Sequence, residues 1–263
     1  MKLLVSLFIL VAGMSSASEF SPATEPVDGC PGDFFVQKAR VFDAVTICAT
    51  ENVESSKIKH AANVTAQWLD NNEDGSVDEP ALLSHLRQNH ATLIMTRSGL
   101  SEAAFESLSP YLEYIVGQDL SADETNPKSS RDASQEEIHH LIVNAGWQWY
   151  LPLVFSDSEN QQSLLRKQWQ LADEKGLYRY NDPTCDSACK TVEFFYLGTA
   201  AYLGSAADLQ SDEMGIKNKQ ALREELPGLV KIFESELYHY PIFKWPDGHY
   251  PYRNSIRYVG LKE

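Results

Sequence analysis

The spacing of apolar residues divides the chain into segments that favour strands and segments that favour helices. Residues 34–49 are rich in β-branched and aromatic side chains and predict one or two strands, and residues 91–96 (ATLIMT) predict a short buried strand. Residues 53–69 carry apolar side chains at helical spacing, and a second helix is expected to begin within residues 81–86. The first half is therefore predicted to combine strands with a helix–loop–helix unit.

The second half is predicted to be mostly helical. Ser101 is expected to cap one helix, and Ser134 with Glu137 forms a capping-box arrangement at the start of another that ends near Gly146. The predicted helices cover residues 101–114, 134–145, 161–172 and 185–203, of which the last is a long apolar run and should be the central buried helix. The sequence thus predicts an α-rich α+β fold in a single domain.

Two segments have a composition that is unlike that of a regular helix or strand. Residues 121–134 have almost no apolar side chain, which predicts a mobile surface loop. Residues 238–258 are aromatic and interrupted by prolines. Such a tail is expected to pack against the core, and a platform that stacks on sugars is the alternative.

Residues 70–81 (DNNEDGSVDEPA) place oxygen-bearing side chains at alternate positions of a loop between two helices. Gly75 stands at the sixth position, where a calcium-binding loop turns too sharply for a residue with a Cβ. This spacing resembles the EF-hand loop, which surrounds Ca²⁺ with oxygen ligands. The resemblance implies that the calcium ligands are Asp70, Asn72, Asp74, Ser76 and Asp78.

The last position of the loop departs from the EF-hand pattern. Ala81 stands where that family has a bidentate glutamate, so either Glu79 substitutes for it or the affinity is weak. Weak binding suffices outside the cell, where calcium is abundant. The alternative interpretation is an acidic turn that binds no ion.

The amino terminus predicts export from the cell. Lys2, an apolar stretch over residues 3–13 and small residues at 15–17 form the pattern of a secretory signal peptide over residues 1–17. No later segment is long and apolar enough to predict a membrane span. The formal charge of −15 becomes −16 when Lys2 is removed, and so acidic a protein repels nucleic acid and favours cations. We therefore expect residues 18–263 to be secreted and to have no nucleic-acid partner.

The four cysteines fit an oxidising compartment. Their spacing favours one disulfide between Cys30 and Cys48 and another between Cys185 and Cys189, with a zinc site of four thiolates as the alternative. Asn63 begins a glycosylation sequon, which is usable only in a eukaryotic host and only if Asn63 faces solvent.

Residues 135–141 (QEEIHHL) contain two overlapping Glu-x-x-His pairs, a spacing that places the Glu and the His of each pair on one face of a helix. Adjacent residues diverge by about 100° around a helix, so His139 and His140 should not bind one ion together. The two-histidine motif His-Glu-x-x-His of zinc peptidases is absent. The sequence therefore predicts a site with one Glu and one His from this segment and a further ligand from elsewhere.

Glu193 is the preferred distant ligand, because it stands among apolar residues and a buried carboxylate is costly unless it is paired or metal-bound. His60 and His249 are weaker candidates. Glu136 is expected to act as the general base that activates a metal-bound water. The predicted ligands of this second metal, zinc or iron, are Glu137, His140 and Glu193. The ordinary alternatives are glutamates that complement a helix dipole and a Glu193 that forms a salt bridge.

Residues 59–74, 135–141 and 182–193 together resemble a set of secreted proteins of uncharacterised function, a resemblance that implies no activity. The residues themselves favour a secreted calcium-binding protein with a second metal site that acts as a metal-dependent hydrolase of the peptidase kind, on an extracellular substrate. The rival is a non-enzymatic extracellular calcium-binding protein whose acidic surface and aromatic tail contact matrix or carbohydrate.

Overall fold

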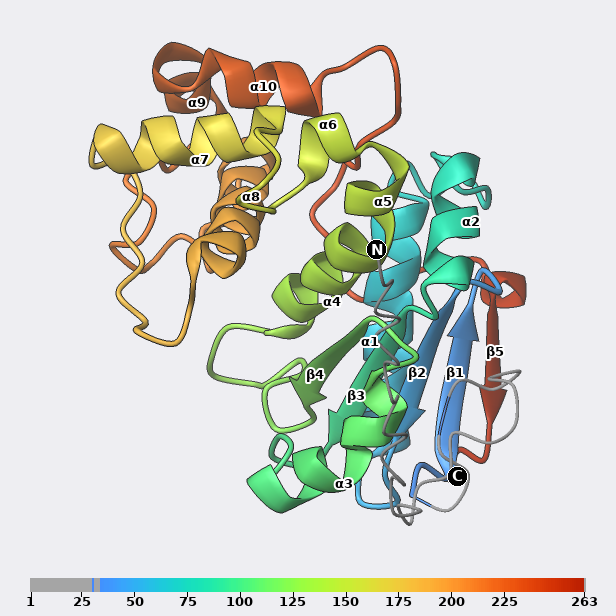
Figure 1. Ribbon diagram of the computed structural model, residues 1–263. Helices are drawn as coiled ribbons and strands as arrows, with labels where there is room; N and C mark the ends of the chain where they lie inside the picture. The colour runs from blue at the N-terminus through green and yellow to red at the C-terminus, as the bar shows by residue number, and fades with distance from the viewer. Residues whose placement is uncertain (1–29, 31–33, 263) are drawn as a thin grey trace, which may run out of the picture.

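The computed structural model describes Cys30 and residues 34–262, so the predicted signal peptide over residues 1–17 lies outside the described residues. Within this range the chain forms a five-stranded mixed sheet covered by helices, with a further group of helices beyond one edge of the sheet (Figure 1). The predicted α-rich α+β fold is therefore confirmed.

The sheet has the strand order β4-β3-β2-β1-β5. The strands are β1 (Gln37–Val41), β2 (Val45–Ala49), β3 (Thr92–Thr96), β4 (Gly117–Ser121) and β5 (Ile256–Val259). The first two form an antiparallel hairpin, β2, β3 and β4 run parallel, and β5 returns from the carboxyl end of the chain to pair antiparallel with β1. The strands predicted within residues 34–49 and 91–96 are confirmed.

The predicted helices are also found, with shifted ends. They are α1 (Ser55–Leu69), α2 (Pro80–Gln88), α3 (Glu102–Leu112), α4 (Ser134–Ile142), α7 (Leu164–Glu174) and α8 (Ser187–Leu203). Shorter helices follow α4 and α8, namely α5 (Gln148–Tyr150), α6 (Pro152–Phe155), α9 (Lys219–Glu225) and α10 (Pro227–Phe233). Ser101 caps α3 as predicted, because its side chain accepts a hydrogen bond of 3.2 Å from the Ala104 amide.

Two faces of the sheet are covered differently. Helix α1 lies behind the sheet and α3 lies on the opposite face near β3 and β4 (Figure 1). On the α3 side a small separate core contains Phe35, Cys48, Ile94 and Leu108. Helix α4 packs beside β4, and α8 packs on α4 from the far side. This stacking brings α8 to the helix that carries the QEEIHHL segment.

Helix α8 is the long buried helix that the apolar run predicted. Its start is fixed by Asp186, whose carboxylate accepts hydrogen bonds from the Ala188 and Cys189 amides, at 3.0 and 2.9 Å. Its end is fixed by Gly204 in the left-handed conformation, with φ of 82°. Most residues between these ends are buried, and the partly buried Glu193 faces His140 of α4.

Both predicted disulfides are present. The Cα atoms are 5.7 Å apart in Cys30–Cys48 and 5.3 Å apart in Cys185–Cys189. The first bond ties the chain ahead of β1 to the β2 strand, and the second closes one turn at the start of α8. Two such bonds fit an oxidising compartment. Among the described residues no helix is long and apolar enough to cross a bilayer.

The segment 121–134, predicted to be a mobile surface loop, runs from the last residue of β4 to the first residue of α4. The Ala133 amide donates to the Glu124 carbonyl at 3.0 Å and closes the loop on itself. Lys57 of α1 donates to the Thr125 carbonyl at 2.6 Å. These hydrogen bonds connect the segment to itself and to α1, and hydrophobicity patterns do not report such contacts.

The aromatic tail packs against the core, as expected for its composition. Tyr238, Tyr240 and Tyr250 are buried, whereas Phe243 remains exposed. The tail lies beside the acidic loop 70–81: the Asn71 side chain accepts from the Phe243 amide at 2.7 Å and donates to the Lys244 carbonyl at 2.7 Å. The last part of the predicted tail contributes the start of β5.

Candidate metal centre

Helix α4 begins differently from its prediction. Ala133 is the N-cap residue and the Ser134 side chain makes no capping bond. Instead Asp132 Oδ1 accepts hydrogen bonds from the Ser134 amide (3.0 Å) and the Ser134 hydroxyl (2.7 Å). The capping box between Ser134 and Glu137 is therefore wrong, which leaves Glu137 free to face another partner.

Glu136 and His140 lie one turn apart on α4 and face Glu193 of α8. Each of the three residues offers one ligand atom, and these atoms all lie within 4.8 Å of one another. A spacing of four residues places the first two on one helix face, and the packing of α8 on α4 supplies the third. Among the described residues this is the one group of His, Cys, Asp or Glu side chains that converges in this way.

The convergent group takes Glu136, whereas the sequence predicted Glu137 as the ligand and Glu136 as the base. Glu137 lies on the other side of the imidazole, with its Oε2 atom 3.8 Å from His140 Nδ1. The same oxygen accepts a hydrogen bond of 2.6 Å from Gln118 of β4. Glu136 therefore belongs to the convergent group, and Glu137 lies beside it.

Two nitrogens of His140 thus face two different carboxylates. Nδ1 faces Glu137, and Nε2 lies 3.6 Å from Glu193 Oε2 and has no hydrogen-bond partner although it is buried. An unpartnered buried nitrogen aimed at carboxylates is an arrangement that a cation can complete. Burial alone would lower the pKa of His140, but the facing carboxylates of Glu137 and Glu193 raise it.

Burial raises the pKa of Glu193 to about 7, and the nearby Glu136 adds to this while His140 opposes it. Glu136 itself pairs with Arg131, which also contacts Asp208 Oδ1 at 3.2 Å. Asp208 is held in turn by the Tyr196 hydroxyl at 2.5 Å. The ion pair with Arg131 therefore fixes the position of Glu136, whereas burial disfavours the ionised form of Glu193.

His139 points away from this group, as the helix geometry predicted. Its Nε2 atom is 2.7 Å from the Tyr240 hydroxyl, and its ring packs among Trp68, Phe195 and Tyr196. Complete burial, together with the neighbouring His140, lowers the pKa of His139 well below its ordinary value. It is a buried neutral side chain that joins α4 to the aromatic tail.

The two weaker histidine candidates lie elsewhere. His60 Nε2 is 2.6 Å from Asp132 Oδ2, so it ties α1 to the loop ahead of α4. His249 is exposed, and its amide donates to Asp247 at 2.9 Å. Neither residue belongs to the convergent group.

Several residues of the centre were missed by the sequence analysis. Arg131 and Asp208 are separated by 77 positions and Gln118 lies 19 positions before Glu137, so only the fold brings them together. The one sequence feature that could have indicated them is Arg131, a charged residue five positions before Glu136, but it stands in a segment that is polar throughout.

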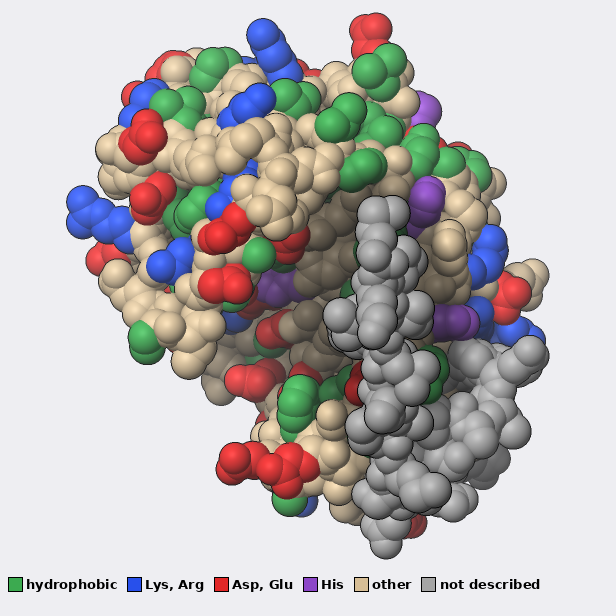
Figure 2. All heavy atoms as spheres, in the orientation of Figure 1, with side chains coloured by type: hydrophobic (Ala, Val, Ile, Leu, Met, Phe, Trp, Pro, Cys, Tyr) green, Lys and Arg blue, Asp and Glu red, His purple; other side chains and the backbone are tan. Residues whose placement is uncertain are grey.

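Figure 2 shows a hollow between the α7–α8 helices and the sheet edge, with histidine and acidic side chains on its wall.

The acidic loop 70–81 folds around its own carboxylates. Asp70 Oδ1 and Oδ2 accept from the Asp74 and Gly75 amides at 3.1 and 2.9 Å, and Gly75 has the positive φ of 94° that the turn requires. Asn72 accepts from the Asp74 amide at 2.9 Å. Burial, with repulsion from Asp70 and Asp74, raises the pKa of Asp78.

Two further contacts complete the loop. Asp74 Oδ1 accepts from the Ser76 amide at 2.8 Å, and the Tyr250 hydroxyl donates to Asp70 Oδ2 at 2.5 Å. Glu79, the suggested substitute for the missing ligand, instead accepts from the His239 amide at 3.1 Å. The loop carboxylates are not part of the convergent group around His140.

Glycosylation requires a solvent-facing Asn63 side chain, but this side chain is hydrogen-bonded within the fold. It is half-buried in α1, and its Nδ2 atom donates to the Gly248 carbonyl at 2.8 Å. The sequon hydroxyl of Thr65 is fully buried and donates to the Ala61 carbonyl at 2.8 Å. In the folded protein Asn63 serves to hold the aromatic tail.

Comparison of the chain with protein-family models, with curated proteins and with solved structures finds no match. The functional argument therefore rests on the geometry of the site.

Proposed function

We propose that the protein is a metal-dependent hydrolase whose metal ligands are Glu136, His140 and Glu193. The observation that carries this proposal is the convergence of three ligand atoms within 4.8 Å, one of them the buried and unpartnered Nε2 of His140. Three protein ligands with an open position are typical of catalytic rather than structural zinc sites. Zinc is the metal we expect first, and iron is the second choice because imidazole suits both metals.

The sequence spacing supports the same assignment. In His-Glu-x-x-His the two ligands are four residues apart and the glutamate follows the first of them. Residues 136–140 (EEIHH) keep this spacing with a glutamate in the first ligand position. The type of the first ligand differs from that motif, while the separation of Glu136 and His140 is the same.

Each residue of the centre has a separate task in this proposal. Glu136, held by Arg131, presents a carboxylate oxygen from α4, and Glu193 presents one from α8. Glu137 faces Nδ1 of His140, a position that orients the imidazole so that Nε2 points at the ligand group. The bound metal supplies Lewis acidity that lowers the pKa of a coordinated water for attack on an amide or ester.

The rival interpretation is a polar network in which no metal takes part and Glu193 keeps a proton shared with Glu136. Metal analysis separates the two. Mature protein purified without chelators should contain about one equivalent of zinc or iron, and both His140→Ala and Glu193→Gln should lose it. His239→Ala, at a largely exposed histidine, is the matched control and should keep the metal.

Turnover is then tested on peptide and ester substrates with the same variants. Glu137→Gln should keep the metal but reduce kcat/KM, because the imidazole loses its orienting charge. Metal content that is unchanged in His140→Ala would disprove the site, and a metal-loaded protein without turnover would favour the non-enzymatic, matrix-contacting rival.

We propose in addition that the loop 70–81 binds calcium weakly and stabilises the fold. The support is the crowding of Asp70, Asp74 and Asp78: burial raises the pKa of Asp78, and repulsion from the other two carboxylates acts in the same direction, against hydrogen bonds from the Asn71 and Asn72 amides. Calcium should raise the melting temperature, and Asp74→Ala should abolish the rise, whereas the exposed Asp123→Ala should not. An equal rise in Asp74→Ala would refute the calcium assignment.

A further inference from the structure

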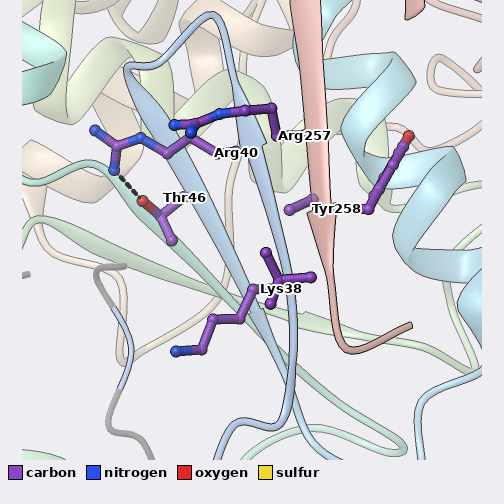
Figure 3. Close-up of a pocket in the computed structure, with 7 residues that line it drawn as sticks. Lys38, Arg40, Thr46, Arg257 and Tyr258 are labelled. Carbon is purple, nitrogen blue, oxygen red and sulfur yellow. Dashed lines mark hydrogen bonds between the residues drawn. The ribbon is translucent and has the colours of Figure 1, made fainter. Parts of the chain in front are cut away.

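The outer face of the sheet, opposite α1, carries a basic pocket of about 380 Å³ between β1, β2 and β5 (Figure 3). Its lining includes Lys38, Arg40 and Thr46 from the hairpin and Arg257, Tyr258 and Val259 from β5. Lys38 and Arg40 are two residues apart on β1, so both side chains lie on the same face of the sheet. A cationic pocket stands out in a chain whose formal charge is −15.

Two arginines face each other across neighbouring strands in this pocket. Arg40 and Arg257 are direct partners in the β1–β5 register, and Figure 3 shows both side chains extending to the same side of the strands. Like charges directly opposite one another destabilise a sheet. They share one carboxylate oxygen, Asp43 Oδ1, which is 3.4 Å from Arg40 Nε and 2.8 Å from Arg257 Nη2.

A third arginine reaches the same turn. Arg87 of α2 donates to the Asp43 carbonyl at 2.9 Å and to the Phe42 carbonyl at 3.2 Å. Arg40 is only 24% exposed, and its Nε atom is buried without a hydrogen-bond partner. Asp43, by contrast, is 68% exposed. Two guanidinium groups thus contact the exposed Asp43 carboxylate, and a third contacts the backbone of the same turn.

We propose that this pocket binds the sulfate or phosphate ester group of an extracellular ligand. Guanidinium groups donate in a planar fork that matches the oxygens of such oxyanions, and two of them side by side match a dianion. The ligand's oxyanion takes the place of Asp43 as the common partner of Arg40 and Arg257. The pocket volume lies in the range of small-molecule sites, so it holds the group that carries the ester as well. This site shares no residue with the proposed metal centre.

The test is isothermal titration calorimetry of the full mature protein at low ionic strength with four probes: sodium sulfate, sodium phosphate, glucose 6-phosphate and heparin. Arg257→Ala should weaken binding at least about tenfold, because one charge-assisted contact is lost. Asp43→Asn should tighten binding severalfold, because the competing carboxylate is removed. Arg223→Ala, at an exposed arginine paired with Glu234, is the control and should leave binding unchanged.

The probes distinguish the source of the group. Binding of the inorganic ions indicates a site for a free oxyanion, and binding of heparin or the sugar phosphate alone indicates an ester on a larger molecule. Absence of binding to all four probes overturns the proposal. Equal affinity in Arg257→Ala and the unaltered protein, or weaker binding in Asp43→Asn, overturns it as well. Arg257 is 71% exposed, so its loss does not disturb the core, and unfolding curves verify this.

Discussion

Asp132 joins the helix of the proposed metal centre to the helix behind the sheet, and its removal has a predictable cost. Its Oδ2 atom is 2.6 Å from His60 Nε2 of α1. Its Oδ1 atom accepts from the Asn126 amide at 2.9 Å, from the Ser134 amide at 3.0 Å and from the Ser134 hydroxyl at 2.7 Å. The carboxylate is 16% exposed, so solvent screens these contacts little.

The size of the effect follows from the pKa of Asp132. Burial by itself raises this pKa, but hydrogen bonds from His60, Asn126 and Ser134 outweigh it and lower the pKa from 3.8 to about 2. The difference corresponds to about 2 kcal/mol of stability at neutral pH. Because the folded-state pKa is the lower one, this stability is fully present above the unfolded-state pKa and is lost as the pH falls through about 2. At pH 3 about 1 kcal/mol remains.

Asp132→Asn keeps the size of the side chain and removes its charge. Urea unfolding followed by circular dichroism should show a free energy of unfolding about 2 kcal/mol below that of the unaltered protein at pH 7, and about 1 kcal/mol below it at pH 3. Asp123→Asn, in the same segment but exposed, is the control and should change stability by less than about 0.5 kcal/mol. A loss at pH 7 as small as that of the control, or a loss that does not shrink at pH 3, would refute the reasoning.

Three further changes test how the tail and the disulfides hold the fold. Gly248→Ala should lower the free energy of unfolding in urea by more than about 2 kcal/mol, because φ is 76° and a Cβ would lie 2.1 Å from His60 Cε1. The control Gly204→Ala has a φ of 82° but open space around the added Cβ, so it should cost only about 1 kcal/mol. Equal losses in the two variants would contradict the close contact with His60. Tyr250→Phe should cost about 1 to 2 kcal/mol, since it removes a buried donor to Asp70, and an unchanged unfolding midpoint would argue against that bond. Replacing both cysteines of Cys30–Cys48 by serine should lower the free energy of unfolding by about 3 kcal/mol, because this bond closes a loop of 18 positions. The same change in Cys185–Cys189, which spans 4 positions, should lower it by about 2 kcal/mol. A larger loss for the shorter loop would show that loop-closure entropy is not the main source of the stabilisation.

The sequence predicted the elements whose signals are local. Ser101 and the apolar period identified α3, and the long apolar run identified α8. Strand β5 was missed because its residues IRYV are mostly exposed and follow a proline-rich stretch, and only pairing with β1 makes them a strand. Strand β4 was missed because its sequence GQDLS is polar and has no strand pattern of its own.

The sequence predicted two of the three residues of the convergent group but not its detailed geometry. His140 and Glu193 converge as the sequence analysis expected, because a buried carboxylate and a Glu-x-x-His segment are visible in the sequence. Glu136 converges in place of the predicted Glu137, because the partners that direct these side chains, Arg131 and Gln118, come from the preceding loop and from β4. Which of two adjacent helix residues faces a site can be decided only when the elements that pack on each side of the helix are known.

The charges around His140 explain why metal analysis is the decisive experiment. Four carboxylates, those of Glu136, Glu137, Glu193 and Asp208, surround the centre, and among the described residues Arg131 is the one lysine or arginine in ion-pair contact with them. Burying this excess of negative charge is costly unless positive charge is supplied. The raised pKa values of His140 and Glu193 mean that protons can supply that positive charge near neutral pH. A bound divalent cation would supply it in their place, so metal analysis decides between a protonated polar network and the proposed metal site.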